Sequence, residues 1–159
     1  MRDTTLSYIA GFLDGDGSVM FQLKPRSDYA YGFQIKVTLA FYQKSSNRSI
    51  LEWLHRNLEV GAVRDRNDGI GEYDIEGFAP VQNVLELIEP YVILKRKQVE
   101  TALELIAEIT GQPQPSPQEF LGWCVKVDVF QALNYAKNRK HTSESVRKVL
   151  ESKGYLVPP

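Results

Sequence analysis

The sequence contains little cysteine and histidine and no long apolar run. The single cysteine, Cys124, excludes an intrachain disulfide, and with two histidines it cannot build a structural zinc site. The longest apolar run, from Phe120 to Val125, is far shorter than the roughly 20 residues of a membrane-spanning helix. No basic segment followed by an apolar one opens the chain. We therefore expect a soluble intracellular protein. The compartment stays open between an organelle and an archaeal or bacterial cytoplasm.

Net charge is also nearly absent, because 19 lysines and arginines face 20 aspartates and glutamates. Charge of one sign is nevertheless gathered in short segments. Residues 17–48 hold five basic residues against the single acid Asp28, and residues 134–148 hold five against Glu144. Residues 95–97 form a third basic cluster. Any one charged run is more often an ordinary solvated surface, but this segregation lets a nearly neutral protein present one basic face.

The length of 159 residues and the 43% hydrophobic content fit one globular domain. We expect a single domain over residues 1–159, with a core at about 4–110 and a C-terminal helical extension at about 116–153. Apolar residues at helical spacing from Leu6 to Leu13 predict a first helix, capped by Thr4 or Thr5 and ended by Gly15 and Gly17.

Alternating apolar and polar residues predict the strands. Residues 19–23 form a half-buried strand before Pro25, and residues 31–42 form a second, long strand. Two shorter strands, 60–66 and 71–76, flank an Asn-Asp-Gly turn. Further helices are expected at 50–58 behind a cap at Ser45 or Ser46, at 80–89, at 94–110, at 117–136 behind a Ser116–Glu119 capping box, and after Thr142. The order α-β-β-α-β-β-α with added C-terminal helices predicts an α+β fold with a four-stranded antiparallel sheet.

One segment, Ile9 to Gly17, combines two informative features. Gly11 and Gly15 lie four residues apart and share one helix face, where a second backbone can approach closely. Asp14 and Asp16 place carboxylates at the C-terminal end of a helix, where the helix dipole disfavours anions. Acids at that end favour the binding of a cation, although an isolated Asp-Gly-Asp-Gly is more often a plain turn.

This segment reads IAGFLDGDG and resembles the signature of the LAGLIDADG homing endonucleases. The resemblance covers roughly residues 7–150 and is greatest for the intron-encoded, single-motif, homodimeric enzymes. The local stretches that carry it are Gln22–Pro25, Gln43–Lys44, Val63–Arg66, Lys95–Gln98 and Thr142–Arg147.

The chain has no second copy of the motif, so the resemblance implies that an identical chain completes the active site, with Gly11 and Gly15 at the dimer interface. It implies that Asp16 of each protomer and the Gly15 carbonyl bind a divalent cation, Mg²⁺ or another such as Mn²⁺.

The resemblance also implies catalytic roles for other residues. Gln43 matches the position that orders the attacking water, and Lys95 matches a basic residue near the scissile phosphate. The family's other basic residue falls on Asn47, where this sequence departs from the pattern. The neighbouring Arg48 is expected to substitute for it.

Two groups of residues are expected to bind double-stranded DNA. A strand of twelve residues at about 3.3 Å each is roughly 40 Å long, and a two-stranded ribbon fits the major groove. Two protomers would cover about 20 base pairs of a pseudo-palindrome. The expected base-reading residues are Ser18, Gln22, Lys24, Arg26, Asp28, Tyr29, Gln34, Lys36, Thr38, Arg64, Arg66 and Glu72. The expected phosphate-binding residues are Lys137, Arg139, Lys140, His141, Thr142 and Ser143.

The sequence thus favours a site-specific double-strand DNA endonuclease that promotes the spread of its own intron. One alternative is an RNA-binding maturase that helps an intron to fold, and another is a DNA-binding module without catalysis. The combination of Asp16, Gln43 and Lys95 favours the enzyme, because neither alternative needs a metal-binding acid at a helix end. The expected partners are DNA and a second copy of the chain, with no membrane, and RNA only for a maturase.

Overall fold

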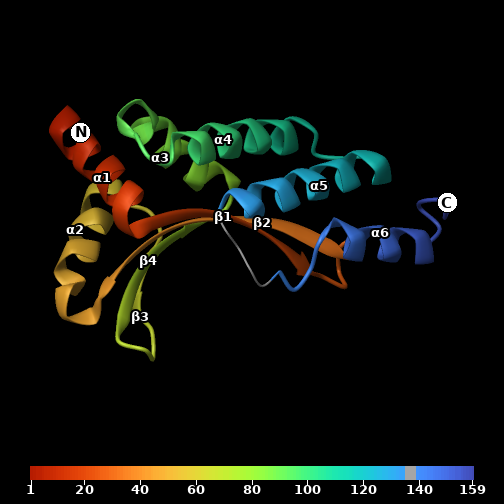
Figure 1. The fold of residues 1–159 in the computed structure, drawn as a ribbon, viewed down its shortest axis with the longest axis horizontal. Helices are drawn as coiled ribbons and strands as arrows, with labels where there is room; N and C mark the ends of the chain where they lie inside the picture. Colours follow the sequence, from red (N-terminus) through yellow and green to blue (C-terminus); the bar gives the residue numbers. More distant parts are fainter. Residues whose placement is uncertain (135–138) are drawn as a thin grey trace. The chain divides into compact units, whose positions relative to one another are not determined.

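A computed structural model describes residues 1–134 and 139–159, and these residues form an α+β fold, as predicted. Within them the sheet has four strands in the order β1-β2-β4-β3 (Figure 1). The strands are β1 Gly17–Pro25, β2 Phe33–Lys44, β3 Ala62–Asp65 and β4 Ile70–Glu76. Strand β4 pairs antiparallel with β2 on one side and with β3 on the other, which confirms the predicted antiparallel sheet.

The described residues also form six α-helices and two short 3₁₀ turns. The helices are α1 Asp3–Asp16, α2 Arg48–Leu58, α3 Phe78–Ile88, α4 Arg96–Gly111, α5 Pro117–Leu133 and α6 Ser143–Ser152, and the turns are Ser45–Asn47 and Glu89–Tyr91. The predicted order α-β-β-α-β-β-α is confirmed. None of the helices in the described ranges has the length and apolarity that crossing a membrane requires.

By its internal contacts the chain divides into two compact units, which are described separately. Unit 1 comprises residues 1–20 and 37–103, and unit 2 comprises residues 21–36 and 104–159. Each unit therefore combines segments that are far apart in the sequence.

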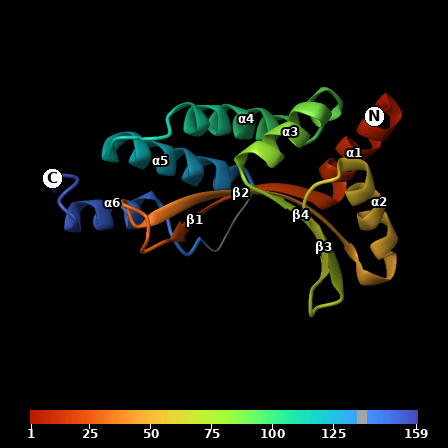
Figure 2. The ribbon, with the colours of Figure 1, turned by 180° about the vertical axis from the view of Figure 1, so that it is seen from behind.

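The core of unit 1 lies between helices α1 to α3 and one face of its strands. Helix α2 packs on β3 and β4, and α3 packs on β4 and α1. Phe41 of β2 and Tyr73 of β4 are paired in register, both fully buried, with stacked rings 5.8 Å apart. The opposite, polar face of β4 carries Glu72, Asp74 and Glu76. The β3–β4 hairpin is seen from behind in Figure 2.

The core of unit 2 joins helices α5 and α6 to the end of β1 and the start of β2. The ring of Phe21 lies 4.9 Å from that of Phe130, and Gln131 Nε2 donates a 2.9 Å hydrogen bond to the Phe21 carbonyl. Tyr31 donates from its hydroxyl to the Pro115 carbonyl at 2.7 Å, and its ring lies 5.3 Å from Phe120. Helix α5 thereby holds the tip of the β1–β2 hairpin.

Several predicted helix ends are confirmed and others are wrong. The capping box of α5 is present, since Glu119 N donates to Ser116 Oγ at 3.1 Å and Ser116 N donates to Glu119 Oε2 at 2.7 Å. Helix α1 instead begins at Asp3, so Thr4 and Thr5 lie inside it and cap nothing, and it continues through Gly15 to Asp16. The predicted cap of α2 is also wrong, because residues 45–47 form a 3₁₀ turn before Arg48.

The bounds of the strands differ from the predicted ones by at most two residues at either end. Strand β2 covers 33–44 rather than 31–42, because Gly32 N donates to the Tyr29 carbonyl and adopts a φ of +78°, which keeps residues 29–32 in the turn. Helix α5 ends at Leu133 among the described residues, and the predicted end at Ala136 lies outside them.

Candidate active site

The C-terminal end of α1 is fixed by close packing at Gly17. A Cβ atom on Gly17 would lie 2.8 Å from Leu13 Cδ1 and 3.1 Å from the carbonyl oxygen of Ala40 in β2. Since real Cβ atoms do not approach so closely, only glycine lets the chain pass directly from α1 into β1 at this point. Asp14, Gly15 and Asp16 are therefore held in the last turn of α1, next to β2.

Asp14 accepts hydrogen bonds from three successive backbone N–H groups just before α4. They are those of Ile93 at 2.9 Å, Leu94 at 3.0 Å and Lys95 at 3.0 Å. Burial alone would raise the pKa of Asp14, but these hydrogen bonds and the charge of Lys95 outweigh it and lower the pKa. The carboxylate of Asp14 is thus hydrogen-bonded to the backbone segment that leads into α4.

Lys95 binds the end of α1 in return. Its Nζ donates to the Leu13 carbonyl at 2.9 Å and also to the Gly17 carbonyl. Helix C-termini favour cations, and the ammonium of Lys95 is a second donor to the Leu13 carbonyl, which also accepts from the Gly17 backbone N–H. Burial lowers the pKa of Lys95, and the charges of Asp14 and Asp16 oppose that shift only in part.

Gln43, at the end of β2, completes the group. Its Nε2 donates to Asp16 Oδ2 at 3.5 Å, and its Oε1 accepts from Lys44 N at 2.9 Å. Asp16 itself is exposed. The structure therefore brings Asp16, Gln43 and Lys95 together around the end of α1. We call this the Asp16 group.

Arg48 has different partners. Its guanidinium forms an ion pair with Asp65 at 2.7 Å and another with Glu52 at 3.0 Å, and its Nη2 donates to the Val63 carbonyl at 3.4 Å. These contacts join the start of α2 to β3. Among the described residues, Arg48 is bound there and is not part of the Asp16 group.

The exposed face of α1 is lined by glycine. A Cβ atom on Gly11 or Gly15 would meet no atom within 4 Å, and the neighbouring Tyr8 is half exposed. A surface hollow runs along this face, lined by Ser7, Tyr8, Gly11, Phe12, Gly15 and Asp16. The face therefore has room for a second helix at close range.

The donor atoms at this end of α1 fit a magnesium ion shared with other ligands. Within residues 1–134 and 139–159, no three His, Cys, Asp or Glu side chains converge on one metal position. One chain can offer the exposed carboxylate of Asp16 and the Gly15 carbonyl. Mg²⁺ is typically bound through one or two carboxylates and keeps several waters, so this sparse all-oxygen set suits it.

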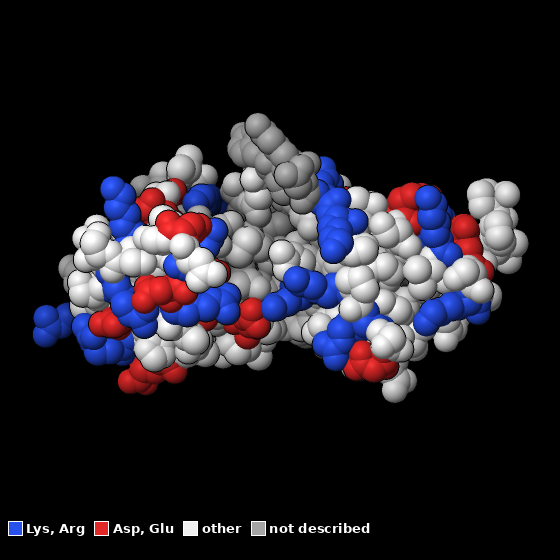
Figure 3. Space-filling model, turned by 90° about the horizontal axis from the view of Figure 1, so that it is seen from below, with Lys and Arg blue, Asp and Glu red and all other residues white. Residues whose placement is uncertain are grey.

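On the polar strand face of unit 1, basic residues are paired with acids. Arg64 Nη2 lies 3.5 Å from Glu72 Oε1 and 3.3 Å from Asp74 Oδ1, and Arg66 Nη2 lies 2.8 Å from Asp68 Oδ2. Asp74 is only 6% exposed although it belongs to this face. Figure 3 likewise shows acidic side chains directly beside basic ones rather than an unbroken basic surface. The other predicted readers in unit 1, Ser18 and Thr38, are half-buried.

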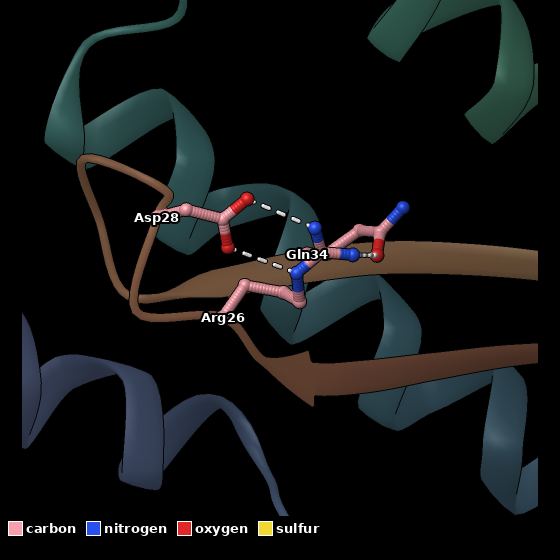
Figure 4. Close-up of polar contacts among 3 residues, drawn as sticks. All are labelled: Arg26, Asp28 and Gln34. Atoms are coloured by element: carbon pink, nitrogen blue, oxygen red, sulfur yellow. Dashed lines mark hydrogen bonds and ion pairs between the residues drawn. The ribbon is translucent and has the colours of Figure 1, made fainter.

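In unit 2 the predicted base-reading residues cluster at the hairpin tip. Arg26 donates from Nε and Nη2 to the two carboxylate oxygens of Asp28 at 3.0 and 2.9 Å, and from Nη1 to Gln34 Oε1 at 3.2 Å (Figure 4). The Arg26 guanidinium also lies 5.0 Å from the centre of the Tyr29 ring. Its hydrogen bond lowers the pKa of Asp28. Gln22 and Lys24 are exposed on β1, and Lys36 is half-buried on β2.

The predicted phosphate-binding segment is anchored by Asp128 of α5. Ser143 donates to the Asp128 carboxylate from its backbone N at 3.1 Å and from Oγ at 2.5 Å, and Arg139 Nη1 donates to the Asp128 carbonyl at 3.1 Å. His141 lies against the ring of Phe33, with centroids 5.6 Å apart. The remaining predicted members are Lys140, which is exposed, Thr142, which is half-buried, and Lys137, which lies outside the described residues.

Sequence reasoning named Asp14 only as an acid that favours a cation, whereas the structure engages it with three backbone N–H groups, and it assigned no role to Asp74 or Asp128. The partners of each acid lie on another helix, strand or loop, so the spacing of residues near the acid in the sequence does not indicate the pair. The only signal available was for Asp14, because an acid at a helix C-terminus needs a compensating donor or cation.

Two known DNA endonucleases are similar to this chain over most of its length. DNA endonuclease I-CreI of Chlamydomonas reinhardtii is 40% identical over 147 residues, which cover 92% of this chain and 89% of I-CreI. DNA endonuclease I-CvuI of Chlorella vulgaris is 32% identical over 151 residues, which cover 95% of this chain and 92% of I-CvuI.

Solved structures of homing endonucleases also superpose closely on this chain. The crystal structure of I-CvuI in complex with its target in the presence of Ca superposes with a TM-score of 0.89 and 31% identity over 97% of each chain. The archaeal intron-encoded homing endonuclease I-Vdi141I, complexed with DNA, has a TM-score of 0.82 at 18% identity, which shows a shared fold.

Residues 9–103 match the family described as LAGLIDADG endonuclease, and this range includes the motif at the end of α1 and every member of the Asp16 group. The matched range and the 40% identity to I-CreI lead to one conclusion. The chain belongs to the LAGLIDADG endonuclease family.

Proposed function

We propose that this protein is a homodimeric, Mg²⁺-dependent homing endonuclease that cuts both strands of a long pseudo-palindromic DNA site and so promotes the mobility of its intron. The observation that carries the proposal is the Asp16 group, in which an exposed acid, an amide and a half-buried lysine meet at the end of α1. The DNA complex of I-CvuI and the DNA endonuclease I-CreI support DNA as the substrate. We propose that residues 1–159 act as one endonuclease domain.

A second copy of the chain is the proposed partner. Asp16 is the one exposed carboxylate of the group, and cutting two strands needs two such centres. The glycine face of α1 leads to Asp16, so packing two copies of α1 through Gly11 and Gly15 would bring the two Asp16 carboxylates near one axis. Ile93 and Leu94, beside Asp14, are 84% and 73% exposed, and such large apolar side chains favour burial against a partner.

The residues of the Asp16 group divide the chemistry of phosphodiester hydrolysis among them. Asp16 and the Gly15 carbonyl would hold Mg²⁺ or another divalent cation such as Mn²⁺, which would polarise a phosphate and lower the pKa of a water. Gln43, next to Asp16 through its Nε2, orients the attacking water.

Lys95 supplies a fixed positive charge for the developing charge on the phosphate. Its ammonium is held on two carbonyls of the α1 end, so it needs little reorganisation during the reaction. Arg48 could take the family's second basic position only by leaving Asp65 and Glu52, so we give it no step in this mechanism.

DNA binding is divided between readers on the strands and positioning residues in the C-terminal segment. The polar side chains of β1 to β4 and the hairpin tip would contact base edges, which carries sequence specificity. Arg139, Lys140, His141 and Thr142 would contact phosphates, which carries affinity and its dependence on salt. The ordering of residues 139–143 by Asp128 and Phe33 supports this second role.

The test is a cleavage and binding assay on a plasmid pool with randomised pseudo-palindromic inserts of about 20 base pairs. We expect the wild type to linearise a subset of plasmids with Mg²⁺ and none with EDTA. Asp16→Asn should bind the selected site but not cut it, because it removes the charge of the metal ligand. Gln43→Ala and Lys95→Ala should each slow cleavage by roughly a hundredfold with little loss of affinity.

Glu104→Gln is the matched control, since it removes one acid from an exposed position of α4 and should leave cleavage unchanged. Cleavage by Asp16→Asn at the wild-type rate would refute the metal site. A loss confined to affinity in Gln43→Ala and Lys95→Ala would move both residues to the phosphate-contacting class. Binding of intron RNA without DNA cleavage would favour the maturase, and DNA binding without cleavage would favour the non-catalytic module.

A further inference from the structure

At the tip of the β1–β2 hairpin, hydrogen bonds link Asp28 to Arg26 and Arg26 to Gln34. Three of the five N–H donors of Arg26 are already engaged, two by Asp28 and one by Gln34. The Tyr29 ring lies over the guanidinium. The residues lie on one loop and the adjacent strand of unit 2, with Gln34 on the polar face of β2 (Figure 4).

The hydrogen bond to Arg26 determines which end of the Gln34 amide remains available. A guanidinium has donors and no acceptor, so the Gln34 atom that faces Arg26 must be the carbonyl oxygen. The NH₂ group of Gln34 therefore forms the other edge of the amide. Asp28 keeps Arg26 in this orientation by binding it through two parallel hydrogen bonds.

This polarity affects how Gln34 can read a base. Bidentate recognition of adenine uses both ends of an amide, with the oxygen accepting from N6 and the nitrogen donating to N7. In this chain one of the two lone pairs of that oxygen already accepts from the cationic Arg26. This bond polarises the amide, which weakens the oxygen as an acceptor for adenine N6 and strengthens the N–H donors of Gln34. Guanine presents only acceptors, O6 and N7, along the same groove edge, and an amide that offers N–H donors matches it.

We propose that the Arg26–Asp28 pair sets Gln34 as a hydrogen-bond donor, so that each protomer prefers guanine over adenine at the base that Gln34 contacts. This inference rests on the proposed function and adds to it the base selected by one part of the DNA-binding surface. Arg26 and Asp28 are then positioning residues for Gln34. Both carboxylate oxygens of Asp28 accept from Arg26, so this proposal uses Asp28 to orient Arg26 rather than to contact a base, the role suggested by the sequence.

The pair also carries no net charge, and this separates its role from that of a phosphate contact. The ion pair of Arg26 with Asp28 has an N–O distance of 2.9 Å, so the two charges largely cancel at a distance. Changing both residues together should therefore alter base preference without altering the dependence of affinity on salt.

The experiment is a binding selection from duplexes in which every position of a roughly 20 base-pair pseudo-palindrome is randomised, carried out in EDTA so that bound DNA stays intact. The full-length wild type is compared with Arg26→Ala, Gln34→Ala, Arg26→Ala/Gln34→Ala (called the double variant) and Arg26→Gln/Asp28→Asn. Lys140→Ala is the control for a phosphate contact and should weaken binding without changing any base preference.

We expect the wild type to select guanine at one position of each half-site, and Gln34→Ala to lose preference at that position. Arg26→Ala should lower the ratio of guanine to adenine there by roughly tenfold or more, the scale of one bidentate base contact. The double variant should match Gln34→Ala, since Arg26 acts through Gln34. Arg26→Gln/Asp28→Asn should show the same shift with an unchanged salt dependence.

An unchanged ratio in Arg26→Ala would overturn the inference while leaving the proposed endonuclease intact, and so would selection of adenine by the wild type at the Gln34 position. If the wild type selects no sequence at all from the pool, both the proposed function and this inference are overturned. Thermal melting of each variant checks folding, and because the Arg26 side chain is exposed we expect its replacement to leave the melting temperature unchanged.

Discussion

Replacing Asp14 by alanine tests how the end of α1 is held. The substitution leaves three backbone N–H groups without the carboxylate that now accepts from them at 2.9 to 3.0 Å. Hydrogen bonds to a charged group contribute about 1.5 to 3 kcal/mol each, but the N–H groups of Ile93 and Leu94 are exposed and can bind water instead. Only the part-buried N–H of Lys95 loses its partner outright.

We therefore expect the free energy of unfolding to fall by about 2 to 3 kcal/mol rather than by the full sum. For a chain of this size, each kcal/mol lowers the melting temperature by about 2 to 4 °C, which gives a decrease of roughly 4 to 12 °C. Urea unfolding measures the change directly, and an unchanged m-value would show that the denatured state is not affected. Asp14→Asn keeps one acceptor oxygen, so its free energy of unfolding should lie between those of the wild type and Asp14→Ala.

Glu104→Ala removes the same charge from an exposed site on α4 and should change stability by less than about 0.5 kcal/mol. The reasoning is refuted if the free energy of unfolding of Asp14→Ala differs from that of the wild type by less than this margin. Such a result would mean that the N–H groups before α4 are satisfied equally well without the carboxylate.

The remaining predictions concern glycine and cysteine. Gly15→Leu should leave the melting temperature of the monomer unchanged or raised, because its Cβ meets nothing within 4 Å and helix propensity improves. Sedimentation should nevertheless show that the dimer is lost, and a cleavage assay should show that activity is lost with it. Gly17→Ala should instead destabilise the folded chain in urea, because its Cβ would lie 2.8 Å from Leu13 Cδ1. Burial raises the pKa of the Cys124 thiol to about 12, so an aromatic disulfide reagent at pH 8 should label it only as fast as the chain unfolds. Rapid labelling of the native protein, a stable Gly17→Ala or a fully dimeric Gly15→Leu would each contradict the corresponding prediction.

Much of the fold could be predicted because its signals are local. The helical spacing from Leu6 to Leu13 and the alternation along β2 each report one buried face, and the structure buries those faces. Helix starts were harder, since neighbouring polar residues such as Thr4 and Thr5 are equally good caps on paper. Helix α1 begins at Asp3, before both of these candidate caps, and its N-cap Arg2 makes no side-chain cap hydrogen bond.

The site was predicted in part for the same reason. Motif and resemblance together identified Asp16, Gln43 and Lys95, and the structure brings these three into one group. Asp74 and Asp128 could not be identified from the sequence, because Arg64 meets Asp74 across two strands and Asp128 meets Ser143 across two helices. Such pairs depend on sheet register and helix packing, which no short window of sequence contains.

The mutual binding of Asp14 and Lys95 also governs when a growing chain can assemble the Asp16 group. The partners lie 78 to 82 positions apart in the sequence. A ribosome releases the N-terminal motif first, so the two acids emerge long before the lysine that completes their surroundings. A nascent or truncated chain that stops before Lys95 contains the full motif and still lacks the assembled group. Translation order should therefore delay any activity that depends on the Asp16 group until most of unit 1 has been made, and any split of the protein within residues 18–94 should give two fragments that are inactive apart.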